Sequence, residues 1–494
     1  MNDQDLKPFL YPRSVAVIGA TERPGSWGSF IIEGLRAFPF AGSIYPVNHQ
    51  AERVFGIPAF RSVSDIPGPV DLAVLTIPEN QVEKTLKECG EKGVQGVVII
   101  SAGFGEAVEG GKEREKGLVA LAHTYGMRLM GPNVSGVFNL FADFNASAAP
   151  IGHLIKTPVA AVCQGGYAIY DLLAHGYYRK MGVGIFIHTG NEADLTTTDF
   201  LAMMGDLPEV QAVVMYIEAV KDGRRFLETA RKVAEAKPVV VYKAGKTPGA
   251  SRAAASHTGA LAGSFKVYEG AFDQANVVSC PTMELLLPLG QALAERPPLK
   301  GRRVVILTMG GSWGVALSDA LESEGLRVPN LSPGLQKRLR DMGMPVRASV
   351  KNPVDIGASG LFLAEDLLTE LGREILRSGE ADALILHGFG RPGMDAEGTP
   401  PTLRFYQEIN KNIIRAYAAM EKEFQIPVLI GSAYGPSESQ AVFDLTREGI
   451  RIYQRLDETA QILSRMFRYW ERRGKDRPLS EQAALGAERS SARG

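Results

Sequence analysis

Residues 14–28 read SVAVIGATERPGSWG, a short apolar run that ends at Gly19 and leads into a loop with two more glycines. A continuously apolar run bounded by glycine is typical of a strand buried on both faces of a parallel sheet. The loop suits a tight turn into a helix, and the unpaired N–H groups at a helix start attract phosphate. The stretch therefore predicts a doubly wound α/β domain with a ligand site at the carboxyl ends of its strands.

The residues after this first loop narrow the choice of ligand. The glycines do not have the spacing G-x-G-x-x-G, and the next apolar run, SIYPVN (43–48), ends without the Asp or Glu that would bind the ribose of NAD. An oxidoreductase that uses NAD is therefore disfavoured, and another ligand with phosphate groups is favoured. The alternative is that the glycines only permit a tight turn.

Short apolar runs alternate with longer amphipathic stretches along almost the whole chain, which predicts three α/β blocks. The expected strands are 14–20, 43–48, 71–78, 96–103 and 128–133 in the first block, 158–164, 183–190, 211–218, 238–245 and 276–280 in the second, and 303–311, 381–390 and 426–435 in the third. The Pro-Pro pair in AERPPLKGRR separates the last two blocks. We expect domains at 1–145, 146–297 and 298–470, followed by a flexible tail at 471–494.

Composition narrows the class of protein. The 494 residues carry a net charge of -1, with 45% hydrophobic and 22% charged residues, as in ordinary globular proteins. Such a balance gives no overall attraction to nucleic acid or to a membrane surface, and no long apolar run or signal pattern occurs. The three cysteines are widely spaced and indicate neither disulfides nor a metal cluster. We therefore expect a cytoplasmic protein without a metal site or a nucleic-acid partner.

One histidine stands in an unusual setting. His257 lies within AGKTPGASRAAASHTGALAG (244–263), a run of small residues. An imidazole can act near neutral pH as both nucleophile and leaving group, and a loop of small side chains admits a bulky phosphate. Two glycine-rich turns, VCQGG and TMGGSW, each follow a strand and open a helix, so both could face one anion. Their similarity could equally be a coincidence of α/β architecture.

The order of these motifs resembles the NDP-forming acyl-CoA synthetases, which are relatives of the succinyl-CoA synthetase α subunit. The resemblance rests on IYPVN, LAVLTIPENQV, SAGFGE and GPNVSG in the first block, and on CQGG, TGNEADL, MYIEAVKDGRRF, the run at 244–263, TMGGSWGV and NPVDIG further on. It implies a Rossmann-like CoA-binding domain followed by two flavodoxin-like domains of the succinyl-CoA-synthetase type. It also implies an ADP-forming synthetase that interconverts acyl-CoA with a carboxylic acid through an acyl phosphate.

The same resemblance assigns roles to residues. His257 would carry the phosphoryl group, and Glu218 would hold its imidazole. The amides of Gln164, Gly165, Gly166, Gly310, Gly311 and Ser312 would bind phosphate. The CoA site would comprise Gly19, Ala20, Thr21, Gly28, Asn48, Ile77, Pro78, Ser101, Ala102, Gly103 and Asn133.

No block is left over for the ATP-grasp domain that binds nucleotide in this family. The resemblance therefore implies a separate ATP-grasp β subunit that binds ADP or ATP and Mg²⁺, in an αβ or α2β2 assembly. The sequence does not determine the acyl group, nor whether the nucleotide is ADP or GDP.

Two departures from the family pattern support a second hypothesis. Several relatives have Ser-x-Ser-Gly where this chain has Cys163 to Gly166, and an asparagine where it has Met309. The alternative is a regulatory protein that binds CoA or acyl-CoA without catalysis. His188 and His387, at two strand ends, are interpreted as residues that satisfy local hydrogen bonds.

Overall fold

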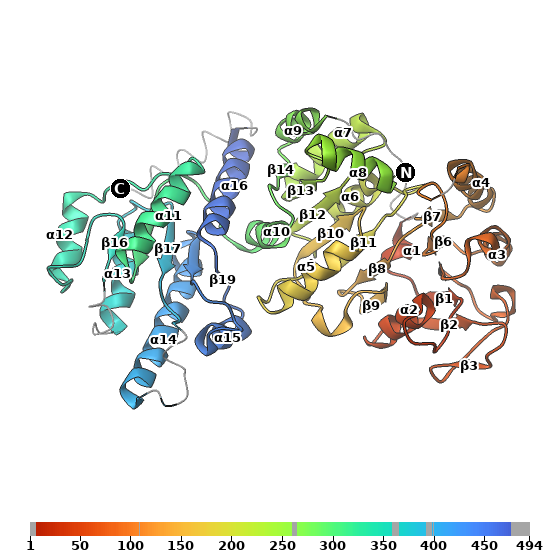
Figure 1. Ribbon diagram of the computed structural model, residues 1–494, viewed down its shortest axis with the longest axis horizontal. Coiled ribbons are helices and arrows are strands. Elements are labelled where there is room, and N and C mark those ends of the chain that lie inside the picture. Colours follow the sequence, from red (N-terminus) through yellow and green to blue (C-terminus); the bar gives the residue numbers. More distant parts are fainter. Residues whose placement is uncertain are drawn as a thin grey trace. The chain divides into compact units, whose positions relative to one another are not determined.

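The computed structural model describes residues 6–107, 109–258, 264–357, 365–391, 398 and 400–475. The chain divides into two compact units (Figure 1), the first made of Met1–Tyr177 and Met181–Ala294 and the second of Tyr178–Lys180 and Glu295–Gly494. The first unit contains two large sheets, and the second contains one.

The first sheet contains five parallel strands in the order β2-β1-β5-β6-β7. Their bounds are Ser14–Ile18 (β1), Ser43–Val47 (β2), Leu72–Leu75 (β5), Gly96–Ile99 (β6) and Arg128–Met130 (β7). All five expected strands are confirmed, each shorter than its apolar run. The chain reverses its direction of winding between β1 and β5, which places a ligand crevice at their carboxyl ends.

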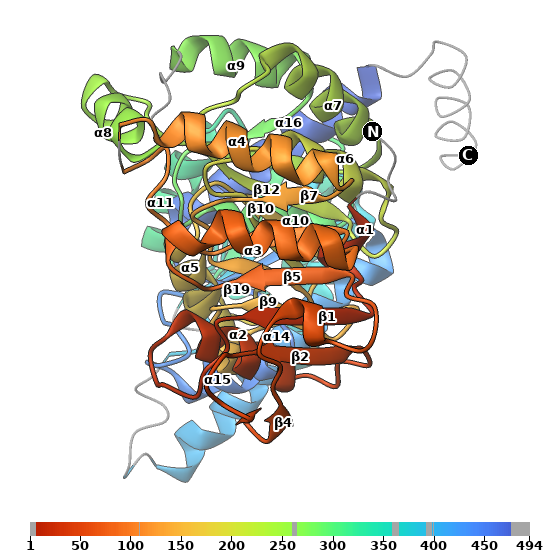
Figure 2. The ribbon, with the colours of Figure 1, turned by 90° about the vertical axis from the view of Figure 1, so that its right-hand side faces the viewer.

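Helices cover both faces of this sheet, because its strands are apolar on both sides. They are α2 (Trp27–Arg36), α3 (Glu79–Lys92) and α4 (Gly111–Thr124), and a small hairpin is formed by β3 (Arg53–Val54) and β4 (Ile57–Pro58). Figure 2 shows α3 and α4 side by side. The Ser26 hydroxyl caps α2 by accepting the Ser29 N–H at 3.3 Å, so the helix begins directly after the glycine loop.

The second sheet has the order β14-β13-β12-β10-β11-β8-β9. Its strands are β8 (Gly136–Asn139), β9 (Phe144–Ser147), β10 (Val159–Cys163), β11 (Ile185–His188), β12 (Ala212–Ile217), β13 (Val239–Lys243) and β14 (Val278–Ser279). The last five are parallel, as expected, but β8 and β9 form an antiparallel hairpin on the edge at β11 that the sequence did not predict. The boundary at 145/146 thus falls inside β9, and the proposed domain limits stay predictions.

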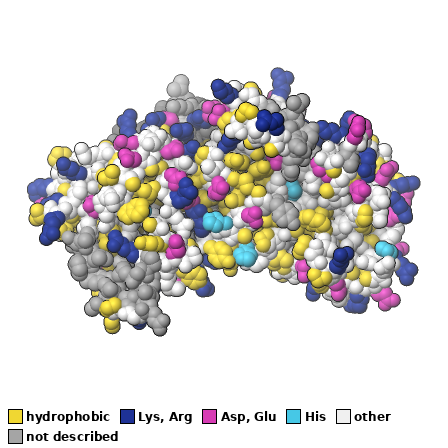
Figure 3. Space-filling model, in the orientation of Figure 1, with side chains coloured by type: hydrophobic (Ala, Val, Ile, Leu, Met, Phe, Trp, Pro, Cys, Tyr) yellow, Lys and Arg dark blue, Asp and Glu magenta, His cyan; other side chains and the backbone are white. Residues whose placement is uncertain are grey.

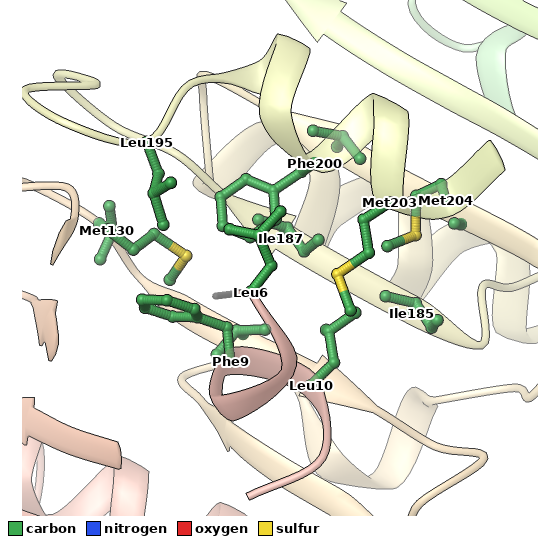
Figure 4. Close-up of a cluster of buried hydrophobic side chains, with 14 of the residues drawn as sticks. Leu6, Phe9, Leu10, Met130, Ile185, Ile187, Leu195, Phe200, Met203 and Met204 are labelled. Carbon is green, nitrogen blue, oxygen red and sulfur yellow. The ribbon is translucent and has the colours of Figure 1, made fainter. Parts of the chain in front are cut away.

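The helices of this second sheet are α5 (Tyr167–Tyr177), α6 (Thr197–Asp206), α7 (Gly223–Ala236), α8 (Pro248–Thr258), α9 (Phe265–Gln274) and α10 (Leu286–Glu295). The short N-terminal helix α1 (Lys7–Leu10) also packs here. Figure 4 shows Phe9 and Leu10 of α1 directed into a cluster with Phe200 and Met203 of α6. The start of the chain therefore helps to join the first two sheets into one unit.

The third sheet lies in the second unit and repeats the same winding, with the parallel order β16-β15-β17-β18-β19. Its strands are β15 (Val304–Thr308), β16 (Val354–Asp355), β17 (Ala383–His387), β18 (Val428–Gly431) and β19 (Ile452–Tyr453). Its helices are α11 (Gly311–Ser323), α12 (Pro333–Asp341), α13 (Glu365–Arg377), α14 (Pro401–Phe424), α15 (Gln440–Arg447) and α16 (Leu456–Lys475). Helix α16 continues past residue 470, where the tail was expected to begin, and residues 476–494 lie outside the described part.

Two surface properties bear on function. Within the described residues, no helix is long and apolar enough to cross a membrane, and no group of three or more His, Cys, Asp or Glu residues is placed to hold a metal ion. On the face drawn in Figure 3, basic and acidic side chains are interspersed over the described surface.

Candidate functional site

The carboxyl ends of β1, β2 and β5 meet at the crevice of the first sheet. The Gly19 N–H donates to the Val47 carbonyl at 3.0 Å. Thr76, directly after β5, donates both its N–H and its hydroxyl to the Ile18 carbonyl at 2.9 Å. These bonds fix the loop at 19–21 between its two neighbouring strands.

Gly19 and Gly28 allow the start of α2 to lie against this loop. Gly19 has a φ of 92°, and a Cβ there would lie 2.7 Å from the Thr76 hydroxyl oxygen. A Cβ on Gly28 would lie 2.1 Å from the Gly19 carbonyl oxygen. Only glycine fits at either position, and the N-terminus of α2 is thereby brought to the crevice, where it can bind phosphate groups.

Replacing Gly28 by alanine is expected to raise the dissociation constant for CoA at least about tenfold, since overpacking of this kind costs roughly 1–3 kcal/mol and moves the loop. Calorimetric titration with CoA measures the change. Gly117→Ala is the matched control, because nothing lies within 4 Å of a Cβ at that exposed helical position. Equal affinities of the two variants for CoA would contradict this assignment.

Asn48 shapes the crevice through its side chain. Its amide nitrogen donates to the Ala20 carbonyl at 2.8 Å, and its amide oxygen accepts the N–H groups of Gln50 and Ala51 at 2.8 and 2.9 Å. Asn48 thus holds the two loops together, and the second hydrogen of its amide nitrogen stays available to a ligand in the crevice.

The loops after β5, β6 and β7 meet at the same edge of the sheet. The Ser101 hydroxyl donates to the Ile77 carbonyl, and the Asn133 N–H donates to the Ser101 carbonyl at 2.9 Å. Gly103 and Asn133 have φ values of 101° and 62°, so both turn away from the sheet in left-handed conformations. Ile77, Ser101, Gly103 and Asn133 are therefore neighbours, as a shared CoA site requires.

Glu106 belongs to this region, although it was not singled out from the sequence. Its carboxylate accepts the Gly103 N–H at 2.6 Å and the side-chain amide of Asn191. Burial raises the pKa of Glu106, but these hydrogen bonds outweigh it and hold the pKa below its ordinary value. Glu106 is thus a carboxylate that fixes the SAGFGE turn.

The segment TGNEAD (189–194) links the first sheet to the second. The Asn191 amide donates to Glu115 at 2.7 Å, and Asn133 donates to the Asn191 side-chain oxygen at 3.3 Å. Asp194 accepts a bidentate pair of bonds from Arg128 at 2.8 and 2.9 Å. The loops after β6 and β7 are therefore joined by hydrogen bonds to the segment that follows β11.

The turn at 163–166 follows β10, and the structure corrects the role given to Gln164. Its backbone N–H already donates to the Tyr216 carbonyl at 3.0 Å. Its side-chain amide donates to the Ala219 carbonyl at 2.7 Å and accepts the N–H groups of Glu218 and Ala219. Gln164 therefore links the ends of β10 and β12 by hydrogen bonds. Its backbone N–H and its side-chain amide are used in these bonds and are not available to a phosphate.

The two glycines of this turn make room for neighbouring rings. A Cβ on Gly165 would lie 2.9 Å from the Tyr216 ring, and one on Gly166 would lie 2.5 Å from Nδ1 of His188. His188 accepts the Ser135 N–H at Nδ1 and lies 2.8 Å through Nε2 from the Gln164 carbonyl, as expected of a histidine that satisfies local bonds. In the part of the chain described, the N–H groups of Gly165 and Gly166 have no hydrogen-bond partner, so they can act as phosphate donors.

Cys163 precedes this turn and is fully buried. Burial raises the pKa of its thiol to about 12, so the thiol is neutral and unreactive at physiological pH. Cys163 is therefore a packing group at the end of β10.

Glu218 lies directly after β12 and is only 4% exposed. The Tyr216 hydroxyl donates to its carboxylate at 3.1 Å, and Gln164 holds its backbone. Lys243, at the end of the adjacent strand β13, is also buried, with its ammonium 4.7 Å from the Tyr268 ring centre. Burial lowers the pKa of Lys243, and the nearby charge of Glu218 partly offsets this.

The chain leaves β13 at the same sheet edge and enters α8, which contains His257. The side chain of His257 lies outside the described residues, and so does the segment 259–263. Since β12 and β13 are parallel neighbours, Glu218 and the segment that leads to His257 both leave the sheet at this edge.

The second glycine-rich turn lies in the other unit, after β15. The Gly310 N–H donates to the Thr308 hydroxyl at 3.2 Å, so this residue, like Gln164, has its N–H occupied. A Cβ on Gly311 would lie 2.8 Å from a carboxylate oxygen of Asp355. Among described residues, the N–H groups of Gly311 and Ser312 have no partner and form the N-terminus of α11.

Comparison with known proteins agrees with this architecture. A CoA binding domain model matches residues 13–139, and a model described as the succinyl-CoA ligase like flavodoxin domain matches residues 156–293. Together with the three sheets wound in the same order, they define a CoA ligase of the succinyl-CoA-synthetase type.

Similar proteins identify the branch of that class. The chain is 40% identical over 459 residues to the α subunit of ADP-forming acetate–CoA ligase II of Pyrococcus furiosus, covering 92% of this chain and 96% of that one. The structure of the dinucleotide forming acetyl-coenzyme A synthetase 1 of Ca. Korarchaeum cryptofilum with phosphate and ADP is 31% identical, with a TM-score of 0.83, over 95% of this chain and 97% of that one. The chain belongs to the α-subunit family of the ADP-forming acyl-CoA synthetases and is an acid-thiol ligase.

Another relative shows a different chain length. ADP-forming acetate–CoA ligase of Methanocaldococcus jannaschii is 36% identical over 354 residues, which are 72% of this chain but 49% of that one. The match with the P. furiosus α subunit, in contrast, extends over nearly the full length of both chains.

Proposed function

We propose that this chain forms acyl phosphate at its CoA side and carries the phosphoryl group on His257 to a nucleotide held by a separate ATP-grasp subunit. In the ATP-forming direction, a phosphate oxygen attacks the acyl carbonyl, the C–S bond breaks and CoA leaves as a thiolate that takes up a proton. A ring nitrogen of His257 then attacks phosphorus, and the carboxylic acid leaves as its anion. A terminal oxygen of ADP finally takes the phosphoryl group and restores the imidazole.

The observation that carries the proposal is the construction of Glu218. Gln164 accepts the Glu218 N–H, and the Tyr216 hydroxyl donates to the Glu218 carboxylate. Glu218 follows β12 at the sheet edge where the segment that leads to His257 follows β13. A carboxylate fixed in this way can orient an imidazole and stabilise the cation that forms on phosphorylation. A protein that only bound CoA would not need this arrangement.

The amides of Gly165 and Gly166 at the start of α5 are the proposed donors to the phosphoryl oxygens on this side. Helix N-termini favour anions because their N–H groups and dipole converge on the same point. This chain lacks the two serine hydroxyls that the family pattern has in this turn, but the backbone N–H groups of Gly165 and Gly166 do not depend on those side chains.

The separate partner is inferred from chain length and names. The relative named as an α subunit matches this chain over nearly its full length, whereas the M. jannaschii relative, named without a subunit, is about one and a half times as long. We infer that the part of that relative outside the match supplies an ATP-grasp domain with ADP or ATP and Mg²⁺, and that this chain obtains such a domain from a β subunit in an αβ or α2β2 assembly in the cytoplasm. Acetate is the first acid to test, because it is named for these relatives.

The proposal is tested by incubating the chain with acetyl-CoA and ³²P-labelled phosphate. We expect a protein-bound label that is lost in acid and kept in base, and that maps to the peptide containing residue 257. With ADP, the label is expected to move to ATP only after the β subunit is added. No label by this route, nor from labelled ATP with the partner present, would instead favour a regulatory CoA-binding protein.

A further inference from the structure

A second histidine at a sheet edge has no place in the phosphoryl transfer proposed for His257. His387 ends β17 and is 1% exposed, and within the described residues neither of its ring nitrogens has a hydrogen-bond partner. The interpretation of His387 as locally satisfied is therefore wrong, in contrast to His188. A buried polar group without a partner destabilises the fold, so its presence calls for a reason.

The surroundings of His387 place it beside the turn that opens α11. Thr308 and His387 are paired on the adjacent strands β15 and β17, and the Met309 N–H donates to the His387 carbonyl at 3.1 Å. The indole of Trp313, in the first turn of α11, lies 5.1 Å from the imidazole between ring centres. On the other side, a Cβ on Gly431 would lie 2.6 Å from the imidazole Cδ2.

The imidazole is thus held between β18 and the first turn of α11, the turn in which the N–H groups of Gly311 and Ser312 have no partner among the described residues. Burial lowers the pKa of His387 to about 4, so the ring is neutral at physiological pH. A neutral imidazole has one N–H donor and one acceptor. The donor and the helix N-terminus together provide the groups that an oxyanion with several oxygens would bind.

We propose that His387 donates a hydrogen bond to a phosphoryl oxygen of inorganic phosphate or acyl phosphate bound at the N-terminus of α11. This inference rests on the proposed function, since it adds a binding residue to a phosphate site of that reaction. Trp313 is 38% exposed and its indole contacts the imidazole, so an anion bound to His387 would lie beside the indole. The emission of Trp313 is therefore expected to report binding.

Phosphate titration of the full chain, followed by tryptophan fluorescence and calorimetry, tests the proposal. His387→Leu is expected to weaken phosphate binding about tenfold or more, the usual effect of losing a hydrogen bond to a charged group. It is also expected to raise the melting temperature, because an unsatisfied polar group is replaced by an apolar one. A histidine with a purely structural role would show the opposite, a lower melting temperature with phosphate affinity unchanged.

Three variants complete the design. His387→Gln retains a donor and is expected to recover part of the affinity for phosphate. Trp313→Phe identifies the emission change, because the chain has only three tryptophans. His153→Asn changes a histidine that makes an edge-on ring contact with Tyr177 in the other unit, and it is expected to leave the affinity for phosphate unchanged.

The outcomes separate this inference from the proposed function. Wild-type phosphate affinity in His387→Leu overturns the role of His387, even if the acid-labile label forms normally. A chain that forms no label but loses phosphate affinity in His387→Leu supports the binding role of His387 and overturns the phosphohistidine step alone.

Discussion

His257→Asn is expected to abolish the acid-labile phosphoprotein and to reduce acyl-CoA synthesis to the background rate. Asparagine has a similar size and polarity, but its amide nitrogen is not a nucleophile at neutral pH, so no N–P bond can form. Because the CoA crevice is built on the first sheet from residues 19–133, CoA affinity should be unchanged. Labelling with ³²P-phosphate and CoA titration of the same preparation measure both properties.

The matched control for this substitution is His153→Asn, which removes an imidazole in edge-on contact with the Tyr177 ring and leaves residues 244–263 intact. Its label and its turnover should equal those of the wild type. Persistence of the acid-labile label in His257→Asn, at any site in the chain, would contradict the assignment of the phosphoryl carrier.

Glu218→Gln is expected to lower the rate of phosphoryl transfer by about 100- to 10,000-fold, the range typical of groups that assist proton transfer or stabilise charge. Glutamine retains the shape and can still accept the Tyr216 hydroxyl, so the fold and CoA affinity should be preserved. The missing negative charge leaves a cationic phosphoimidazole without its counterion. Rapid-quench measurement of label formation on His257 gives the rate.

Tyr216→Phe provides a graded comparison at the same site. It keeps the ring that packs against Gly165 but removes the hydroxyl that donates to Glu218, and the rate should fall roughly tenfold, as for loss of one bond to a charged group. If Glu218→Gln were no slower than Tyr216→Phe, the carboxylate charge would have no role in the transfer.

Much of the architecture was predictable because it depends on local patterns. Buried parallel strands are apolar throughout, so β1, β10 and β15 were recognised in the sequence by composition alone. The hairpin β8–β9 was not, since residues 136–147 gain their strand conformation from pairing with β11. The two-residue strands β16 and β19 are too short to leave a periodic pattern.

The candidate site was predicted less completely. Gly28 was chosen by resemblance, and the close approach to Gly19 gives the steric reason for it. Gln164 was expected to contact phosphate, but the end of β12 uses both its backbone N–H and its side-chain amide. Glu106 and Asn191 were not singled out, because the hydrogen bond between them joins loops that belong to two different sheets.

The sequence by itself determined the three α/β blocks, the glycine loop at the first sheet edge and the small-residue segment around His257, because hydrophobic periodicity and steric size are properties of neighbouring residues. Only the tertiary structure decided which polar groups are satisfied. His188 and His387 both end strands. Ser135, 53 residues away along the chain, donates its N–H to His188, and His387 has no such partner among the described residues. Hydrogen bonds between distant segments form only when the sheets are assembled, and no local pattern encodes them.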